Sequence, residues 1–338
     1  MSDKKKLSLK KNFSWNFIGN LIYSLSQWLI LVLLAKIGNA ELVGLYTLGF
    51  AITAPILMLT NLQLRQVQAT DTTDTYIFND YFGLRIITGF VAIIITLIVI
   101  QLNNYDIYKA FIIFLVALSK IIDSYSDVVY GQLQQKERMD YIGISRIIKG
   151  ISTLIVISVV MIFTDNLILS LLALNISSFF IFMLYDKKII KNFVYSTKPS
   201  FNWEKHKKLI VLTLPLGLML MLGSLNTNIP RILVERFLGE EKLGYFGGIA
   251  YLMVAGNMFI SAVGQAGAPR LAKLYKNNNK NGFINLLLKL VFLGFALGIV
   301  GLLVSIVFGQ LILKLVYNED FIAYLPFFTD YPYGIYIL

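Results

Sequence analysis

The sequence predicts an all-α integral membrane protein that folds as a two-lobe helical bundle. Of the 338 residues, 57% are hydrophobic and only 14% are charged, and the mean hydropathy is +0.70. Soluble domains carry about 25% charged residues. The apolar residues gather in runs of about 20, which is the length that a helix needs to cross the hydrocarbon core of a bilayer.

Nine apolar runs are long enough to be spanning helices. The first is too long for the core of a signal peptide, and its end, "LLAKIGNAE", is a poor cleavage site, so we interpret it as a retained span. The predicted spans are Phe13–Ile37, Val43–Leu62, Phe82–Leu102, Tyr108–Tyr130, Ile142–Phe163, Leu167–Tyr185, Leu209–Val234, Gly244–Ala268 and Phe283–Phe308.

Several functional classes are excluded by composition. The chain has no cysteine, so disulfides, iron–sulfur clusters and thiolate metal sites are excluded. Its single histidine, His206, lies among lysines in "WEKHKK", and we expect a solvated loop residue rather than a metal ligand or a general base. Neither a GxxxxGK[ST] nor a G-x-G-x-x-G motif is present, and we expect no cofactor.

The net charge of +11 is distributed as an orientation signal rather than as a nucleic-acid patch. With the N-terminus placed in the cytoplasm, most of the 30 lysines and arginines fall in segments on that side of the membrane. These segments are the N-terminal lysine cluster, Arg65 with Arg85, Lys136–Lys149 (including Arg146), Asp186–Lys208 and Arg270–Lys280. The bias predicts a multi-pass protein of the cell membrane with a cytoplasmic N-terminus.

An internal repeat predicts two lobes. Shifting the sequence by about 200 residues aligns "ELVGLY" at Glu41 with "EKLGYF" at Glu241, so that Gly44 meets Gly244. Copies with the same orientation are related by an axis along the membrane normal, which is an architecture that transporters use. We expect an N-lobe of six spans at 1–185, a cytoplasmic linker at 186–208 and a C-lobe at 209–338 with three spans and a partial fourth.

Four predicted helices carry a polar stripe within the membrane. At about 100° per residue, each stripe falls on one face of its helix. The stripes are Asn16, Asn20, Ser24 and Gln27 in the first span, Lys120, Asp123, Ser124 and Asp127 in the fourth, Asn228, Arg231 and Glu235 in the seventh, and Asn257, Ser261 and Gln265 in the eighth.

Two interpretations of these stripes stay open. Polar side chains join transmembrane helices by hydrogen bonds, Arg231 can snorkel to the interface, and Lys120 can form a structural pair with Asp123 or Asp127. Alternatively, the four faces share a water-filled cavity, because charged groups in a bilayer usually mark a pathway. Pro230 removes a backbone donor and should bend the seventh helix beside Arg231.

Several stretches resemble the polysaccharide transporter branch of the multidrug/oligosaccharidyl-lipid/polysaccharide exporter superfamily, the O-antigen and capsule flippases. They are "FSWNFIGNLIYSLSQWLI", "YGQLQQKERMDYIGISRIIKG", "LPLGLMLMLGSLNTNIPRILVERFLGEEKLGYFGGIAYLMVAGN" and "GQAGAPRLAKLY". The resemblance implies twelve helices in two lobes and alternating access that moves an undecaprenyl-diphosphate-linked oligosaccharide to the outer leaflet. It also makes a polysaccharide polymerase a possible partner.

With that substrate, Arg231 and Lys120 are candidate groups for attracting the diphosphate, and Glu235 and Pro230 would position Arg231. Relatives tend to have an acidic residue where this chain has "NIPR", so their ion-coupling schemes do not transfer. One alternative is a drug/cation antiporter of the same superfamily, which should have an acidic cavity. Another is a membrane enzyme of surface-polysaccharide assembly, although the predicted outer loops are short and lack histidine.

Repeat logic also predicts that the chain is incomplete. The first half fits six spans, whereas only three clear spans follow the linker. The tail "FIAYLPFFTDYPYGIYIL" contains Pro326, Asp330 and Pro332, and proline in a helix interior costs about 3 kcal/mol. We therefore expect a fragment that is unstable or inactive alone.

Overall fold

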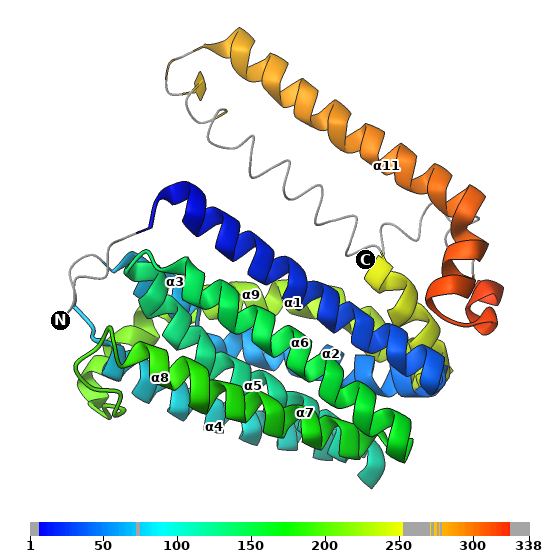
Figure 1. The fold of residues 1–338 in the computed structure, drawn as a ribbon, viewed down its shortest axis with the longest axis horizontal. Coiled ribbons are helices and arrows are strands. Elements are labelled where there is room, and N and C mark those ends of the chain that lie inside the picture. The colour runs from blue at the N-terminus through cyan, green and yellow to red at the C-terminus, as the bar shows by residue number, and fades with distance from the viewer. Residues whose placement is uncertain are drawn as a thin grey trace. The chain divides into compact units, whose positions relative to one another are not determined.

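The computed structural model describes residues 7–71, 75–252, 271, 274–275, 277 and 279–324, and within them all regular structure is helical. The chain divides into two compact units, Met1–Gly244 and Tyr245–Leu338, each of which is described by itself (Figure 1). The predicted lobes 1–185 and 209–338 with their linker stay a prediction.

The first unit is a bundle of long, roughly parallel helices joined by short turns (Figure 1). Its elements are α1 (Leu9–Ile37), α2 (Ala40–Asn61), α3 (Leu64–Thr70), α4 (Phe78–Leu102), α5 (Ile107–Gln135), α6 (Met139–Thr164), α7 (Leu167–Ile181), the π-helix η1 (Phe182–Asp186), α8 (Lys187–Ile190) and α9 (Trp203–Leu238).

Short polar residues in the turns determine where the helices begin. The side chains of Ser8, Asn39, Asp106, Asn166 and Asn202 each accept a hydrogen bond from a backbone N–H in the first turn of the helix that follows. Such N-caps satisfy donors that have no partner within the helix, and in a bilayer those donors would otherwise be costly.

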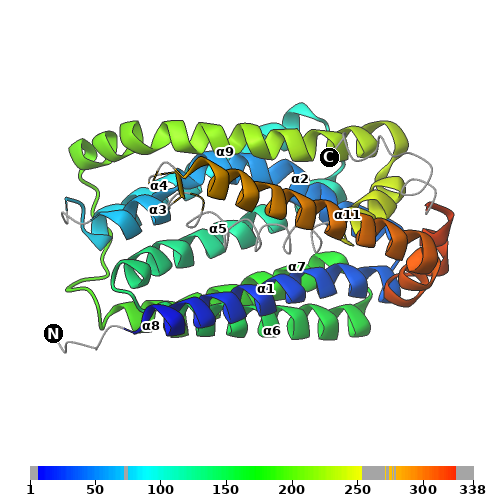
Figure 2. The same ribbon diagram turned by 90° about the horizontal axis from the view of Figure 1, so that it is seen from above.

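The helices pack in two layers with α5 between them (Figure 2). One layer contains α1, α6 and α7, and the other contains α2, α4 and α9. Glycines allow close backbone contact within the first layer: a Cβ on Gly19 would lie 2.5 Å from the Cα of Gly143, and Gly150 lies against Ser26. Small residues of this kind are typical of transmembrane helix interfaces.

Seven of the described helices are long and apolar enough to cross a membrane, which confirms a multi-pass membrane protein. They match seven of the predicted spans and lie within Lys10–Ile37, Ala40–Thr70, Phe78–Leu102, Met139–Thr164, Leu167–Ile190, Trp203–Leu238 and Lys280–Val316. An eighth predicted span is α5, which has 29 residues but carries Lys120, Asp123 and Asp127 in its middle. The ninth, Gly244–Ala268, begins in a helix at 240–252, and its later part lies outside the described residues.

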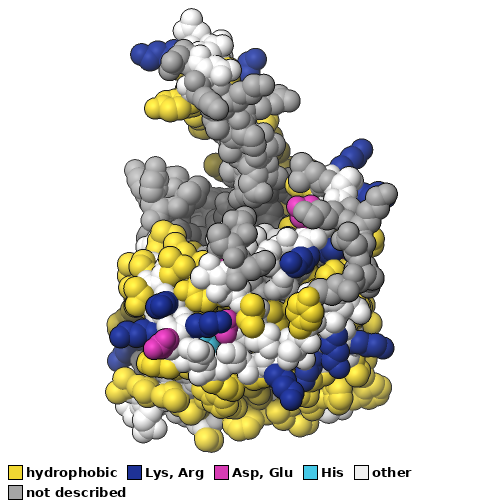
Figure 3. Space-filling model, turned by 90° about the vertical axis from the view of Figure 1, so that its left-hand side faces the viewer, with side chains coloured by type: hydrophobic (Ala, Val, Ile, Leu, Met, Phe, Trp, Pro, Cys, Tyr) yellow, Lys and Arg dark blue, Asp and Glu magenta, His cyan; other side chains and the backbone are white. Residues whose placement is uncertain are grey.

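The segment that joins α8 to α9 is shorter than the predicted loop Asp186–Lys208, because Asp186 ends η1 and α9 begins at Trp203. It lies against the start of α4, where the Ser200 amide donates to the Asn79 carbonyl at 2.9 Å and the Lys205 ammonium pairs with Asp80 at 2.8 Å. Lysine and arginine side chains spread over this end of the first unit (Figure 3).

One sequence-based expectation was wrong about burial. His206 is not a solvated loop residue, since it lies in α9 and is 1% exposed. Arg85, Arg146 and Lys149, which were counted as cytoplasmic orienting charges, lie in helices, Arg85 in α4 and the other two in α6. Their positions near span ends made them look like orienting charges, whereas their side chains turn into the bundle or toward a cavity.

In the second unit, α11 (Lys280–Val316) is followed by the short helix η2 (Glu319–Tyr324). The hydroxyl of Tyr317 donates to the carbonyl of Gly248 at 2.7 Å, and the ring of Phe321 packs against those of Tyr245 and Tyr317. These contacts join the residues after α11 to the helical residues 245–252.

Candidate functional site

A cavity of about 460 Å³ lies in the first unit between α1, α2, α5 and α6. Its wall has an apolar side from α2 and a charged side from α5 and α6. It is lined by Asn20, Tyr23, Phe50, Thr53, Ala54, Leu57, Met58, Asn61, Lys120, Asp123, Ser124, Asp127, Tyr130, Arg146 and Lys149.

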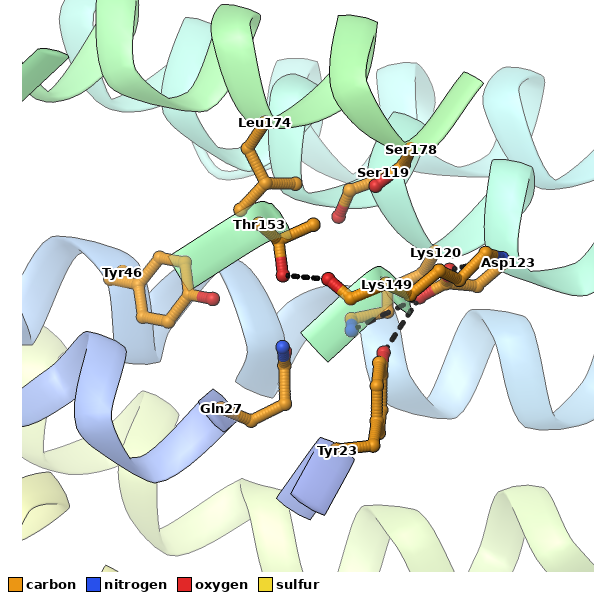
Figure 4. A pocket seen from close by; sticks show the side chains of 10 residues that line it. All are labelled: Tyr23, Gln27, Tyr46, Ser119, Lys120, Asp123, Lys149, Thr153, Leu174 and Ser178. Atoms are coloured by element: carbon orange, nitrogen blue, oxygen red, sulfur yellow. Dashed lines mark hydrogen bonds and ion pairs between the residues drawn. The ribbon is translucent and has the colours of Figure 1, made fainter. Parts of the chain in front are cut away.

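Asp123 is the centre of a charged cluster that lines both this cavity and the small adjoining pocket shown in Figure 4. One carboxylate oxygen accepts from the Lys149 ammonium at 3.1 Å, and the other accepts from the Tyr23 hydroxyl at 3.0 Å. The Lys120 ammonium lies 3.5 Å from Asp123 and 4.9 Å from the centre of the Phe50 ring. Lys120 is thus the most loosely held of the three partners of Asp123.

Lys149 extends this cluster into the protein interior. Its ammonium donates to the Ser126 hydroxyl at 2.6 Å and lies 3.9 Å from Asp186, and both charged side chains are almost fully buried. Asp186 also accepts from the Ser145 hydroxyl at 2.6 Å. Asp186 is the last residue of the π-helix η1, and such irregular turns often mark functional positions.

Asp127, one turn after Asp123, has a different cationic partner. Its carboxylate accepts from the Arg65 guanidinium of α3 at 3.0 Å, and Arg65 also donates to Gln134 at 3.2 Å. The guanidinium lies 5.5 Å from the centre of the Tyr130 ring. Asp127 is therefore neutralised from the side of α3.

Arg146 differs from the other cations of the site. Its guanidinium lies 5.6 Å from the centre of the Tyr130 ring and lines the cavity, yet it makes no hydrogen bond or ion pair with any residue that the structure describes. The cavity lining contains three cationic residues and two carboxylates, so it carries an excess of positive charge. The cations are Lys120, Arg146 and Lys149, and the carboxylates are Asp123 and Asp127. In a medium of low dielectric such a charge attracts an anion strongly.

Asn61, which lines the cavity, is the last residue of α2 and precedes the break of the second span into α2 and α3. Leu62 and Gln63 have φ values of 52° and 51°, a left-handed conformation that costs a residue with a side chain about 1 kcal/mol or more. The buried Arg85 guanidinium donates to the backbone and side-chain oxygens of Asn61 at 3.0 and 2.6 Å. It thereby satisfies a carbonyl that the break leaves without a helical donor.

The family model described as "Polysaccharide biosynthesis protein" matches residues 9–275, which is most of the chain and includes every residue of this cavity. The chain belongs to this family. It is 34% identical over 314 residues to the "Capsular polysaccharide biosynthesis protein CapF" of Staphylococcus aureus, and the match covers 92% of this chain and 78% of the relative.

Two solved structures show the fold of this family member. One is the "Inward-facing conformation of a multidrug resistance MATE family transporter of the MOP superfamily", with a TM-score of 0.61 and 13% identity over 93% of this chain and 78% of that one. The other is the "Crystal structure of MATE in the bent conformation", with a TM-score of 0.55 and 15% identity over 95% and 78%. The resemblance to a family of polysaccharide biosynthesis is confirmed, as is the predicted all-α, MATE-like membrane fold.

The structure brings together predicted polar residues of the first and fourth spans. Asn20 lines the large cavity with Lys120, Asp123 and Asp127. Gln27 lines a small adjoining pocket of about 10 Å³, which has room for roughly one water molecule. Asn16 lies one turn before Asn20, and its side-chain oxygen is buried without a hydrogen-bond partner among the described residues.

The predicted polar residues of α9 lie elsewhere. Arg231 donates to the side-chain oxygen of Asn228 at 3.0 Å, and Glu235 pairs with Lys109 of α5 at 3.2 Å. Asn228, Arg231 and Glu235 are not among the described residues that line the cavity. Helix α9 continues through Pro215 and Pro230. Asn257 and Gln265 lie outside the described residues.

Arg146 and Lys149 are the site residues that sequence reasoning missed, along with Tyr23, Tyr130, Arg65 and Asp186. A signal was available, because Arg146, Lys149 and Thr153 share one face of α6 within the predicted span Ile142–Phe163. Arg146 and Lys149 lie near the start of this span and were counted as orienting charges. The partners of Lys149 lie on α5 and at the end of η1, which helical periodicity cannot reveal.

Within the described part of the chain, no group of three histidine, cysteine, aspartate or glutamate residues could hold a metal ion. The charged residues of the cavity are mixed in sign and are held by each other and by hydroxyl groups. This arrangement can bind a polar, anionic ligand.

Proposed function

We propose that this protein is a flippase that moves a lipid-linked oligosaccharide, the repeat unit of a capsular polysaccharide, from the cytoplasmic to the outer leaflet of the cell membrane. The family, the name of the relative from Staphylococcus aureus and the transporter-type fold support transport within polysaccharide biosynthesis. An undecaprenyl-diphosphate-linked oligosaccharide is the substrate class that fits this role. The proposal includes a cytoplasmic N-terminus.

The single observation that carries the proposal is the uncompensated Arg146 in the cavity wall. A diphosphate linker presents several oxygen acceptors, and a guanidinium binds such a group through two parallel N–H donors. The Arg146 guanidinium lies over the Tyr130 ring, 5.6 Å from its centre, and this cation–π contact leaves its charge uncompensated.

Lys120 would provide the second cation. It lies 3.5 Å from Asp123, whereas Lys149 and Tyr23 hold the same carboxylate at 3.1 and 3.0 Å. Lys120 can therefore turn from Asp123 to an incoming anion, because Asp123 keeps two partners. Asn20 lines the same cavity and supplies an amide that can hydrogen-bond sugar hydroxyls.

Transport of this kind requires no covalent chemistry. The substrate would bind in the cavity from one side, and rearrangement of the helices would expose it to the other side. A polysaccharide polymerase that consumes the translocated repeat unit is the partner that such a step implies. Arg231 would serve as a further cation along the pathway, outside the described cavity.

A drug/cation antiporter is the alternative with the same fold. Its cavity should carry a carboxylate excess in order to attract cationic substrates. Here Arg146 adds positive charge, and Asp123 and Asp127 are each paired with a cation. The balance favours an anionic substrate.

Complementation tests the proposal. The protein is produced in a strain that lacks its own capsule flippase, and surface polymer is measured together with lipid-linked repeat units retained inside the cell. We expect surface polymer to return with the wild-type protein, to fall at least about tenfold with Arg146→Gln and to return in part with Arg146→Lys. Arg236→Gln is the matched control, because Arg236 is exposed at the end of α9 and outside the cavity. Drug efflux without surface polymer would contradict the proposal.

A further inference from the structure

Lys109, in the first turn of α5, joins three elements at one end of the bundle. Its ammonium lies 3.2 Å from Glu235 in the last turn of α9 and 3.1 Å from Glu240 at the start of the helix at 240–252. Glu235 is 7% exposed and Lys109 is partly buried, so these charges are only weakly screened by solvent. Asp106, the N-cap of α5, lies 4.0 Å from the same ammonium.

A second contact closes the same end of the bundle. Gly44 in α2 lies directly against the backbone of Glu240 and Gly244, and a Cβ at Gly44 would overlap the carbonyl oxygen of Glu240. Glu240, which pairs with Lys109, is thus also in backbone contact with α2. This end carries the turns that connect α1 to α2, α4 to α5 and α6 to α7, and it lies opposite the linker between α8 and α9.

The cavity lies further along α2. Ala54, which lines it, is ten residues after Gly44, and at a rise of 1.5 Å per residue the separation is roughly 15 Å. Two of the four helices that line the cavity, α5 through Lys109 and α2 through Gly44, are therefore joined to the helix at 240–252 at this end of the bundle.

We infer that Lys109, Glu235 and Glu240 form an ionic latch that keeps the cavity closed toward the end of the bundle bearing the α1–α2 turn. Two carboxylates share one ammonium, so opening this end must separate charges that joined α5 to α9 and to the following helix. This inference rests on the alternating-access proposal for its purpose, but closure itself can be measured without any transported substrate.

A cysteine reporter in this cysteine-free chain measures closure directly. The full-length protein with Ala54→Cys is treated in intact cells with a membrane-impermeant maleimide, and the rate of labelling is recorded. We expect Lys109→Gln or Glu240→Gln to raise that rate by about tenfold, which corresponds to a shift of ~1.4 kcal/mol in the opening equilibrium. The conservative variant Lys109→Arg keeps a cation between Glu235 and Glu240 and should label at the rate of the reporter alone.

Two controls make the result decisive. Lys36→Gln removes an exposed lysine near the same end that has no ion pair among the described residues, and it should leave the labelling rate unchanged. Asn103→Cys in the α4–α5 turn should label at the same rate with and without Lys109→Gln, and it reports which side of the membrane this end faces. If Asn103→Cys is labelled only in inverted membrane vesicles, the labelling of Ala54→Cys is measured in inverted vesicles as well.

The two outcomes are distinct. Unchanged labelling of the Ala54→Cys reporter in both Lys109→Gln and Glu240→Gln, with normal amounts of protein in the membrane, would overturn the latch. If Lys109→Gln does not reach the membrane, Glu240→Gln decides, because the Glu240 side chain is more exposed and leaves the Lys109–Glu235 pair in place. Failure of surface-polymer complementation would refute the flippase proposal while leaving this accessibility result intact.

Discussion

Gly44 and Gly244 make a reciprocal contact. A Cβ at Gly44 would overlap the carbonyl oxygen of Glu240, and a Cβ at Gly244 would overlap the carbonyl oxygen of Ala40. Adding 200 to Gly44 and Ala40 gives Gly244 and Glu240, so each contact maps onto the other by the shift of the internal repeat. An interface in which each side presents the same patch to the other is the signature of a two-fold axis. The predicted parallel repeat relates the same residues and stays a prediction.

Gly44→Ala should weaken this contact, because the added methyl group has no space and the two helices must move apart. Overpacking of this kind typically costs about 1–3 kcal/mol. We expect a lower unfolding temperature of the purified protein in detergent. Gly223→Ala in α9 is the matched control, since a Cβ there meets no described atom within 4 Å. Equal unfolding temperatures for the two variants would show that the helices at Gly44 separate freely.

Lys149→Met should destabilise the protein strongly. The change leaves Asp123 and the buried Asp186 without their shared cation, and removing one partner of a buried pair costs about 3–5 kcal/mol. The measurement is again the unfolding temperature, with the amount of protein in the membrane. The double variant Lys149→Met with Asp186→Asn should recover part of the loss, because it removes one uncompensated charge. A single variant as stable as wild type would argue against the network.

Lys120→Gln should separate function from stability. Asp123 keeps its bonds to Lys149 and Tyr23, so we expect a change in unfolding free energy of at most about 1 kcal/mol, as for a partly exposed ion pair. Surface polymer in the complementation assay should nevertheless fall. If Asp123→Asn restores transport to Lys120→Ala, Lys120 only neutralises that carboxylate and does not bind substrate.

The sequence predicted the spans because a bilayer imposes a length and a composition on every spanning helix. It also offered Asp123 or Asp127 as a structural partner for Lys120, since residues three or four apart on a helix are neighbours, and Lys120 lies 3.5 Å from Asp123. Contacts between distant segments could not be predicted in this way. Glu235 looked like a partner for Arg231 one turn away, yet it pairs with Lys109, which is 126 residues away.

The inward orientation of Arg146 also could not be predicted from the sequence. Charges near a span end orient a membrane protein statistically, and that rule does not say which of them turn inward. Only the position of Tyr130 across from α6 shows that Arg146 faces a cavity. The π-helix that places Asp186 near Lys149 cannot be recognised from the length or hydropathy of an apolar run.

Tyr195→Cys should test the orientation of the protein. The segment between α8 and α9 was predicted to be cytoplasmic, with Ser200 as its reporter, but Ser200 lies against α4 whereas the Tyr195 side chain is 96% exposed. We expect this variant to resist an impermeant thiol reagent in intact cells and to react after lysis. Labelling in intact cells would place the N-terminus and the linker outside.

Arg231→Lys and Arg231→Ala should distinguish a pathway residue from one that only reaches the membrane interface. The Arg231 guanidinium is half-buried and donates to Asn228, which is 5% exposed and is itself held by the Ser224 carbonyl at 2.8 Å. A held cation attracts an anion by its charge, so lysine should retain part of the surface polymer and alanine should lose most of it, with equal protein in the membrane. Asn228→Asp keeps an oxygen acceptor for Arg231 but neutralises the charge of the guanidinium. We expect this variant to impair transport as Arg231→Ala does. Normal transport by Arg231→Ala would mean that the side chain only snorkels.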